Sequence, residues 1–140
     1  MQVSLLLAAV LSAVASACEW GWQEIDGKCY KLQRSRNTWT MQNFACVYDG
    51  GSLASITSWR ENENVRRAAN GQEIYTGGAS FGYNWEWSDG EYFHGFSNWL
   101  NAEDRSPPLG KPCVKMTSDG YWKASCCAHP PAPAVCVRKY

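Results

Sequence analysis

The stretch YTGGASFGYNWEWSDGEYFHGFSNW (residues 75–99) says most about the fold of this chain. Glycine and aromatic residues dominate it, and no helical spacing of apolar residues persists from residue 81 to residue 112. Within it, Ser88-Asp89-Gly90 is typical of a tight turn between two extended segments. The stretch therefore predicts short strands connected by irregular loops.

Two helices are expected on the N-terminal side of this stretch. Residues 38–48 place apolar side chains at helical spacing, and Thr38 is a suitable N-cap. Residues 58–69 begin with Ser58 and Glu61 at the spacing of a capping box, in which two side chains satisfy free backbone groups at a helix start. Short strands are expected at 29–32, 113–116, 121–122 and 134–137. Helices followed by many short strands indicate an α+β domain.

The composition excludes several classes of function. The chain has 140 residues, which suits one domain, and 13 basic against 13 acidic residues give no net charge. A binder of nucleic acid or of anionic membranes would carry an excess of cations, so neither partner is expected. A hydrophobic fraction of 45% and an aromatic fraction of 14% are too high for a disordered chain.

The N-terminus has the pattern of a cleaved secretory signal. Residues 3–17 are apolar and uncharged and end in Ala15-Ser16-Ala17, the small-x-small pattern that signal peptidase recognises. A membrane span needs about 20 apolar residues, and no later stretch is apolar enough. We therefore expect a signal peptide at 1–17, a mature domain at 18–140, a secreted, extracellular protein and no membrane span.

Seven cysteines lie in the expected mature part, at positions 18, 29, 46, 113, 126, 127 and 136. In an oxidising compartment they predict three disulfides and one cysteine left over, and the spacing does not choose among the pairings. A structural zinc site, the rival interpretation, would prefer paired knuckles or nearby histidines. Cys126 and Cys127 are adjacent, so one of them is free or pairs with another chain.

In order and spacing, these residues resemble a C-type lectin-like domain over nearly the whole mature chain. The matching segments are Cys18-x-x-Gly21-Trp22 with Cys29-Tyr30, Thr38-Trp39 through Cys46, Gly50-Gly51-Ser52-Leu53-Ala54-Ser55-Ile56, Tyr75-Thr76-Gly77-Gly78, Trp85-Glu86-Trp87-Ser88-Asp89-Gly90 with Phe96-Ser97-Asn98-Trp99, Cys113-Val114-Lys115-Met116, Gly120-x-Trp122 and Val135-Cys136. The resemblance implies the small, secreted, long form of the fold: two helices, two small antiparallel sheets and a long irregular loop region, stapled by disulfides.

The resemblance also implies the disulfide pairing. Its bridges correspond to Cys18–Cys29, Cys46–Cys136 and Cys113–Cys127, which leaves Cys126 unpaired. An unpaired Cys126 could link two copies into a covalent dimer. Nothing beside it in the sequence clearly lowers the pKa of its thiol, so it is a poor candidate nucleophile.

Sugar-binding members of the family hold a calcium ion, and the resemblance implies that most of its ligands are missing here. The first ligand triplet corresponds to Glu103-Asp104-Arg105, where only the glutamate matches; the other ligand positions read Lys111-Pro112 and Lys123-Ala124. Arg and Lys side chains offer no oxygen, whereas calcium takes about six to eight. We therefore expect no metal or other cofactor. Either Lys123, Lys111 or Arg105 pairs with Glu103 or Asp104 in its place, or all of these are solvated loop charges.

Aromatic faces can stack on sugar C–H groups without a metal. The family resemblance places Trp87, Trp99 and Trp122 in the core. The surface candidates for ligand contact are Phe81, Tyr83, Trp85, Tyr92 and Phe93, and the alternative for them is that the loop packs on itself. His94 and His129 are expected on the surface. Ligand-binding candidates are therefore Tyr83, Trp85 and Tyr92 together with Glu103, Asp104, Arg105 and Lys123.

The sequence predicts a binding protein and not an enzyme, since no Ser-His-Asp or Cys-His arrangement is evident. The expected function is recognition of a glycan or glycoprotein, on microbial or host surfaces, with a degraded calcium site. One alternative is a calcium-independent module that binds a protein partner through the same loops. A less favoured alternative is binding to ice or mineral surfaces, which needs a flat and rigid face.

Overall fold

The computed structural model describes residues 18–139, so the predicted signal peptide, residues 1–17, and Tyr140 lie outside the described residues. Within this range eight strands form a connected sheet in the order β1-β2-β8-β4-β6-β7, with β3 paired to β8 and β5 paired to β4. The elements in chain order are β1 (Gln23–Ile25), β2 (Lys28–Asn37), α2 (Trp39–Tyr48), β3 (Ser52–Leu53), α3 (Trp59–Ala69), β4 (Ile74–Ser80), β5 (Trp85–Trp87), the 3-10 helix η1 (Ala102–Arg105), β6 (Cys113–Met116), β7 (Trp122–Ser125) and β8 (Ala132–Lys139).

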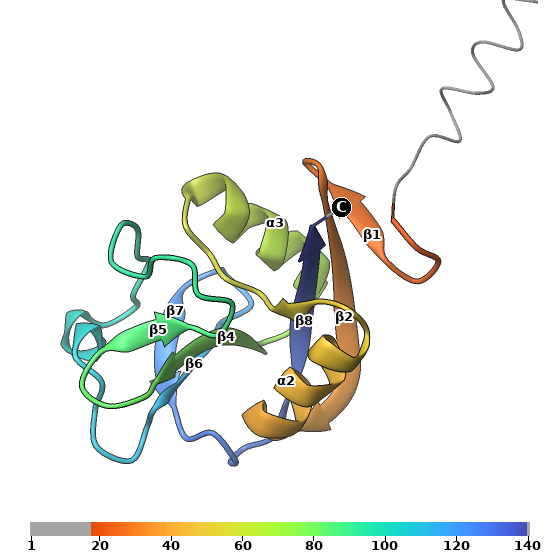
Figure 1. Ribbon diagram of the computed structural model, residues 1–140. Helices are drawn as coiled ribbons and strands as arrows, with labels where there is room; N and C mark the ends of the chain where they lie inside the picture. The colour runs from red at the N-terminus through yellow and green to blue at the C-terminus, as the bar shows by residue number, and fades with distance from the viewer. Residues whose placement is uncertain (1–17, 140) are drawn as a thin grey trace, which may run out of the picture.

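The α+β fold with two α-helices is as the resemblance implied, and one detail of the sheet differs. All strand pairs are antiparallel except β4 and β8, which are parallel and meet at Tyr75 and Ala134. This contact joins the two groups of strands that were expected to form separate sheets. The loops between β5 and β6 lie on the side of the molecule away from β1 and β2 (Figure 1).

Both helices begin where their capping residues predict. The Thr38 hydroxyl accepts a hydrogen bond from the Met41 amide at 3.2 Å, and the Ser58 hydroxyl accepts one from the Glu61 amide at 3.1 Å. The second helix has a variation on the capping box, because the Glu61 carboxylate reaches back to the amide of Thr57 at 2.7 Å and not to that of Ser58. These bonds satisfy amides that have no partner inside the helix.

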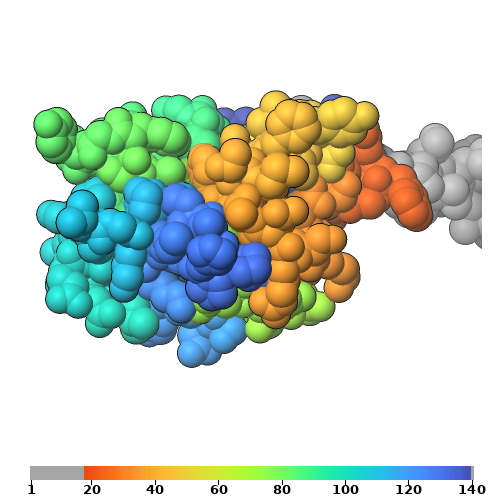
Figure 2. Space-filling model, turned by 90° about the horizontal axis from the view of Figure 1, so that it is seen from below, coloured from red at the N-terminus to blue at the C-terminus, as the bar shows by residue number. Residues whose placement is uncertain are grey.

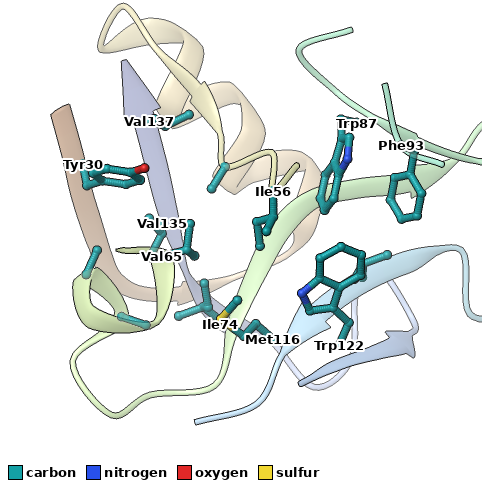
Figure 3. Close-up of a cluster of buried hydrophobic side chains, with 14 of the residues drawn as sticks. Tyr30, Ile56, Val65, Ile74, Trp87, Phe93, Met116, Trp122, Val135 and Val137 are labelled. Carbon is teal, nitrogen blue, oxygen red and sulfur yellow. The ribbon is translucent and has the colours of Figure 1, made fainter. Parts of the chain in front are cut away.

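The two helices pack on opposite faces of β8, which supplies alternate residues to each. Val135 and Val137 belong to the larger buried cluster, together with Val65 of α3 (Figure 3). Ala134 and Cys136 belong to a second cluster that includes Trp39 of α2. Since successive side chains of a strand point to opposite faces, one central strand serves both halves of the core.

Three disulfides stabilise this arrangement, and all three pairings are those implied by the resemblance. Cys18–Cys29 closes the N-terminal hairpin, Cys46–Cys136 ties α2 to β8, and Cys113–Cys127 ties β6 to the segment that precedes β8. Cys126 is the free cysteine of the described chain and is partly exposed. None of the helices in the described part of the chain is long and apolar enough to cross a membrane.

Candidate functional site

The segments that correspond to the family's calcium ligands do come together. The turn of η1 places the Asp104 carboxylate beside β7, where it accepts a hydrogen bond from the Ala124 amide at 3.1 Å. The carbonyl oxygen of the same residue accepts a bond from the Trp85 indole at 2.8 Å. Glu103 and Arg105 are exposed on η1. The fold therefore brings η1 and β7 together at this corner, but the Asp104 carboxylate is already used there for a hydrogen bond to the backbone.

Lys123 is not part of this corner. Its ammonium pairs with Glu73 at 2.7 Å, and in residues 18–139 neither Arg105 nor Lys111 forms an ion pair. Of the two alternatives, the pairing with Glu103 or Asp104 is therefore wrong; Arg105 and Lys111 are exposed charges, as the other alternative has it, and Lys123 pairs elsewhere. The reason is that Asp104 binds the backbone amide of Ala124, which lies in the plane of the sheet, whereas the Lys123 side chain stands on a face of the sheet, where Glu73 pairs with it.

The donor groups in this corner do not fit a calcium ion. Calcium takes about six to eight oxygens, several of them charged, whereas Ala124 offers no side-chain oxygen. No group of three acidic, histidine or cysteine side chains in the described residues is arranged to hold a metal. Two carboxylates, one of them already bonded to an amide, are too few.

A groove of about 580 Å³ lies next to this corner, between the tip of the β4–β5 hairpin and the loop after β5. Phe81 and Tyr83 line it from the hairpin, and Tyr92 lines it from the loop. These three side chains are 62%, 94% and 70% exposed, so their ring faces are open to a ligand. The groove therefore collects three of the five aromatic residues that the sequence suggested for the surface.

The other two, Trp85 and Phe93, are buried, so for them the alternative that the loop packs on itself is confirmed, and they are not on the surface. They are 1% and 5% exposed, and their rings stack at 6.3 Å between centroids. Trp85 also contacts the Trp99 ring, at 5.4 Å. Their burial arises because the long loop folds back over β5, and this depends on contacts between residues far apart in the sequence. Both still line the groove, as its floor beneath the exposed rings.

Polar groups complete the groove. Asn84, Glu86 and Glu91, which were not singled out from the sequence, line it together with His94, and all four are exposed. The alternation in Trp85-Glu86-Trp87 was the signal that could have identified Glu86, because a strand with both tryptophans inside must turn the residue between them outward. The indole nitrogen of Trp87, also in the lining, is buried with no hydrogen-bond partner in the described structure.

His94 lies on the surface, as expected, and it also has aromatic neighbours. Its ring meets those of Tyr92 and Phe93 edge to face, at 5.9 Å and 5.7 Å between centroids. These contacts orient the exposed Tyr92 ring at the groove. Trp87 and Trp122 are buried as expected, and Trp99 packs against the same cluster while remaining partly exposed.

Cys126 lies outside the groove, next to the start of α2. The amide of Trp39 donates to the carbonyl of Cys127 at 2.8 Å, and Figure 2 shows the blue segment around 126–131 beside the orange α2 on the face seen from below. Amide groups of Ala128 and His129 lower the pKa of the Cys126 thiol, with a smaller contribution from Lys115. The expectation that nothing nearby lowers this pKa was therefore wrong, since the loop curls its own amides around the sulfur.

Lys115 is an unusual residue because it is a cation that is 1% exposed. Its ammonium donates to the Pro130 carbonyl at 2.7 Å and lies 4.7 Å from the centre of the Tyr75 ring. Burial lowers the pKa of Lys115, and burial also raises the pKa of Tyr75 to about 12. Through the Tyr75 hydroxyl, which donates to the Cys126 carbonyl at 2.8 Å, this group fixes the loop that carries Cys126.

The mixed sheet, the three disulfides and the loop-borne groove together define a disulfide-stabilised binding domain. The family model for the lectin C-type domain matches residues 35–138. The chain belongs to this family, which is one of non-enzymatic binding domains.

Curated relatives of known name cover most of this chain. Asialoglycoprotein receptor 1 of Rattus norvegicus is 29% identical over 119 residues, which are 81% of this chain and 42% of the receptor. C-type mannose receptor 2 of Homo sapiens is 31% identical over 127 residues, which are 86% of this chain and 8% of the receptor. The chain thus spans less than half the length of these relatives.

Solved structures share the fold along nearly their whole length. The carbohydrate-recognition domain of cow CD23, determined with a GlcNAc2Man3 oligosaccharide, has a TM-score of 0.80 at 26% identity and covers 90% of this chain and 98% of its own. A calcium-independent type II antifreeze protein has a TM-score of 0.79 at 25% identity and covers 88% of this chain and 95% of its own.

Proposed function

We propose that this domain binds a carbohydrate in the aromatic groove, without calcium. The observation that carries the proposal is the set of exposed rings of Phe81, Tyr83 and Tyr92 around a groove of about 580 Å³. Such a volume suits a small ligand, and a concave site with a few convergent polar groups is the usual form of a binding site. The relatives named after glycoproteins and mannose, and the CD23 domain solved with an oligosaccharide, support this ligand class.

The chemistry of the groove fits a sugar ring. One face of many sugars exposes C–H groups, which pack on the rings of Tyr83 and Tyr92, and large rigid aromatic side chains provide contact area at low entropic cost. The Glu86 and Glu91 carboxylates accept hydrogen bonds from hydroxyl groups, and the Asn84 amide both donates and accepts. These groups would hold the ligand from the side while the aromatic rings hold its face.

Calcium independence is part of the proposal. It is supported by the donor set beside η1, where Asp104 bonds the Ala124 amide and Lys123 pairs with Glu73. It is also supported by the likeness to an antifreeze protein that is described as calcium-independent. We propose further that the protein is secreted, acts at microbial or host surfaces and catalyses no reaction.

The proposal is tested by a glycan array on protein secreted from the full chain, in calcium and again in EDTA. We expect the same glycans to be retained in both buffers. Tyr83→Ala and Tyr92→Ala should each weaken binding about fivefold to tenfold, the loss expected from one aromatic contact. Tyr48→Ala, which removes an equally exposed ring from α2, is the matched control and should leave binding unchanged.

Three results would contradict this function in different ways. Binding that disappears in EDTA would contradict calcium independence but not carbohydrate recognition. Glycan binding that all three variants retain would contradict the aromatic groove as the site. A folded protein that binds no glycan in either buffer would favour a protein partner at the same loops.

A second candidate function is binding to ice, and the antifreeze protein of known structure is the observation that favours it. Antifreeze activity is read directly as thermal hysteresis, the gap between the melting and freezing points. Hysteresis in a dilute solution of the secreted protein would support this function. Absence of hysteresis would contradict ice binding, and if glycans bind in the same preparation, carbohydrate recognition remains as the proposed function.

We also propose that Cys126 links two copies of the chain. Its thiol is partly exposed, and the amides of Ala128 and His129 favour the thiolate, which is the form that reacts with disulfides. In an oxidising compartment a free thiolate of this kind is readily oxidised, and a second copy offers the same thiol.

A further inference from the structure

The chain is neutral overall, but it carries a local group of arginines without an ion pair. Arg34, Arg36 and Arg67 form no ion pair with any residue between 18 and 139, and all three are exposed. Arg34 and Arg36 lie on β2, and Arg67 lies in the last turn of α3. Arg105 and Lys111, which also lack an ion pair in this range, lie elsewhere, on η1 and in the loop before β6. We call the area around Arg34, Arg36 and Arg67 the cationic surface.

A groove of about 490 Å³ opens at this cationic surface. It lies between the N-terminal hairpin and the C-terminal end of α3, and Arg34 and Arg67 line it from these two elements. Gln23 and Asn70 add side-chain amides, while no aspartate or glutamate lines the groove. Lys31 is also in the lining, but its ammonium is taken by Asp49 at 3.0 Å. Arg34 and Arg67 thus give this groove two guanidinium groups and no lining carboxylate; Glu63, one turn before Arg67 on α3, interacts with the Arg67 charge from outside the lining.

The groove is separate from the aromatic groove. In the sheet, β8 lies between β2, which lines this groove, and β4 with its partner β5, which lead to the aromatic groove. Figure 1 shows the same separation, with β2 and the end of α3 away from the loops around β5. A ligand in one groove would leave the other groove free.

We propose that this second groove binds the anionic groups of an acidic glycan, that is, the sulfate or carboxylate groups of a saccharide chain. A guanidinium presents a planar fork of donors that matches two oxygens of a sulfate or carboxylate. The amides of Gln23 and Asn70 can bond the hydroxyl groups between the charged positions. The inference does not rest on the aromatic groove.

Other anionic ligands fit the groove less well. A nucleic acid draws its affinity from many phosphate contacts, and two free arginines in the lining are too few for it. An acidic peptide would bring apolar side chains, while Ala68 and Leu32 are the main apolar side chains that the lining offers to receive them. Polar, hydroxyl-rich chains with spaced charges match the lining of this groove better.

The test uses the secreted full chain and three size-matched polysaccharide probes: heparin fragments with sulfate and carboxylate, hyaluronan fragments with carboxylate only, and neutral dextran. We expect binding to heparin fragments, weaker binding to hyaluronan, and none to dextran. Binding should weaken as the ionic strength rises, because exposed charges are screened. Arg34→Gln with Arg67→Gln should lower affinity for heparin at least about tenfold, the effect of losing charge-assisted hydrogen bonds.

Arg60→Gln is the matched control, since it removes the same charge from the exposed side of α3 outside the groove. It should change the affinity by less than about twofold, a difference too small for a lost contact. The proposal is overturned if wild-type protein does not bind heparin or if the double variant binds heparin as tightly as wild type. It is also overturned if Arg60→Gln lowers the affinity for heparin as much as the double variant does. Tighter binding of a polyglutamate peptide than of heparin would overturn the saccharide class. Glycan binding at Tyr83 and Tyr92 is measured separately, so the two sites can fail independently.

Discussion

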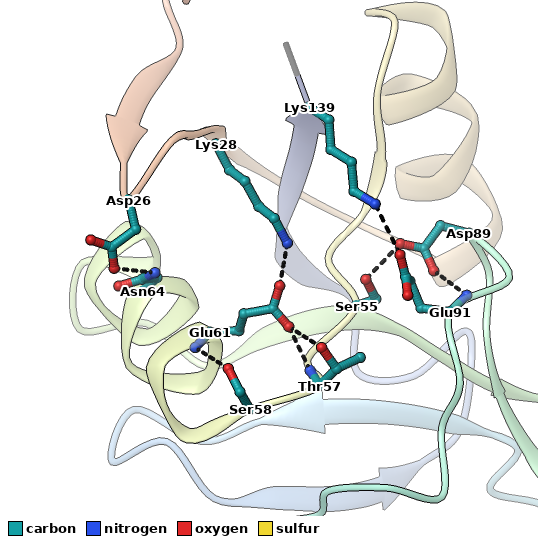
Figure 4. A network of polar contacts seen from close by, with 10 residues as sticks. All are labelled: Asp26, Lys28, Ser55, Thr57, Ser58, Glu61, Asn64, Asp89, Glu91 and Lys139. Atoms are coloured by element: carbon teal, nitrogen blue, oxygen red, sulfur yellow. Dashed lines mark hydrogen bonds and ion pairs between the residues drawn. The ribbon is translucent and has the colours of Figure 1, made fainter.

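The carboxylate of Glu61 is held by three groups from two residues, Lys28 and Thr57. One oxygen pairs with the Lys28 ammonium of β2, and the other accepts hydrogen bonds from the amide and hydroxyl of Thr57 (Figure 4). Burial alone would raise the pKa of Glu61, but Lys28 and Thr57 favour the charged form and hold the pKa below its ordinary value of 4.5. A single side chain therefore links the start of α3 to the hairpin.

Because the pKa of Glu61 is lowered in the folded state, the free energy of unfolding depends on pH in the acid range. A carboxyl whose pKa is lowered in the folded state stabilises the fold above its unfolded pKa, and the stabilisation is lost as the pH falls through the folded value. We expect Glu61→Gln to cost about 1 kcal/mol at neutral pH, the net value of a partly exposed charged contact. Urea unfolding below pH 4.5 should then show a weaker loss of stability in the variant than in wild type. Glu86→Gln, at an exposed position without an ion pair, should follow wild type; a Glu61→Gln profile parallel to wild type would contradict the prediction.

Gly78 shows a different constraint, which is space. A Cβ built at this residue of β4 would lie 2.7 Å from a methyl carbon of Val114 and 3.3 Å from the ring of Trp87. Gly78→Ala should therefore destabilise the fold by about 1–3 kcal/mol through overpacking. Gly95→Ala is the matched control, because its nearest neighbour is the mobile side chain of Tyr92 at 3.5 Å. Chemical denaturation measures both, and equal midpoints for the two variants would show that β4 can move to accommodate the methyl group.

At the scale of elements, the disulfides differ in how far apart in the sequence their two cysteines lie. Cys46–Cys136 joins α2 to β8 across 90 residues, whereas Cys18–Cys29 spans 11 residues of the N-terminal hairpin. A cross-link stabilises chiefly by restricting the unfolded chain, so the longer loop contributes more in this model. The model gives about 4–5 kcal/mol for the long loop and about 3 kcal/mol for the short one.

We therefore expect Cys46→Ala with Cys136→Ala to lower the unfolding temperature more than Cys18→Ala with Cys29→Ala. The long bridge also lies in the buried core, while the short one lies near the end of the described chain. Loss of packing should therefore also make removal of the long bridge more destabilising. Calorimetry on the two double variants makes the comparison. A larger loss from the hairpin bridge would contradict the entropic explanation.

The elements also show which parts of the secondary structure could be predicted from the sequence alone. The starts of α2 and α3 were predicted because the capping bonds join residues within four positions of one another. The turn at Ser88-Asp89-Gly90 was predicted for the same reason, and the Gly90 amide donates to the Trp87 carbonyl at 3.0 Å. The prediction of a second extended segment after this turn was wrong, because residues 91–98 form no strand and Trp99 makes only an isolated bridge to Trp122.

At the scale of the whole molecule, the proposed link through Cys126 makes a prediction about the state of association. Protein secreted from the full chain should show a species of twice the monomer mass on a non-reducing gel, and reductant should convert it to monomer. Cys126→Ser should remove this species while leaving the three other bridges intact. Wild-type protein that runs only as monomer under oxidising conditions would contradict the covalent dimer.

The tertiary structure decided which side chains can meet a ligand. Trp85 and Tyr83 have similar sequence surroundings, yet one is 1% and the other 94% exposed. The difference arises because the loop that follows β5 brings Phe93 and Asp104 onto Trp85. Lys123 was misjudged for the same reason, since its partner Glu73 precedes β4 and is far from Lys123 in the sequence. Cys126 was misjudged for another reason: the amides that lower the pKa of its thiol are those of Ala128 and His129, and only the conformation of the loop turns them toward the sulfur.

The sequence by itself determined the family, the helix starts and the chemical groups present beside η1. The last of these follows because a side chain such as Lys111 or Ala124 cannot supply an oxygen in any conformation. Only the tertiary structure decided which aromatic rings are exposed, that Arg34 and Arg67 share one groove, and which thiolate is favoured. Burial and electrostatic environment are sums over neighbours that the fold brings together, and most of those neighbours are distant in the chain.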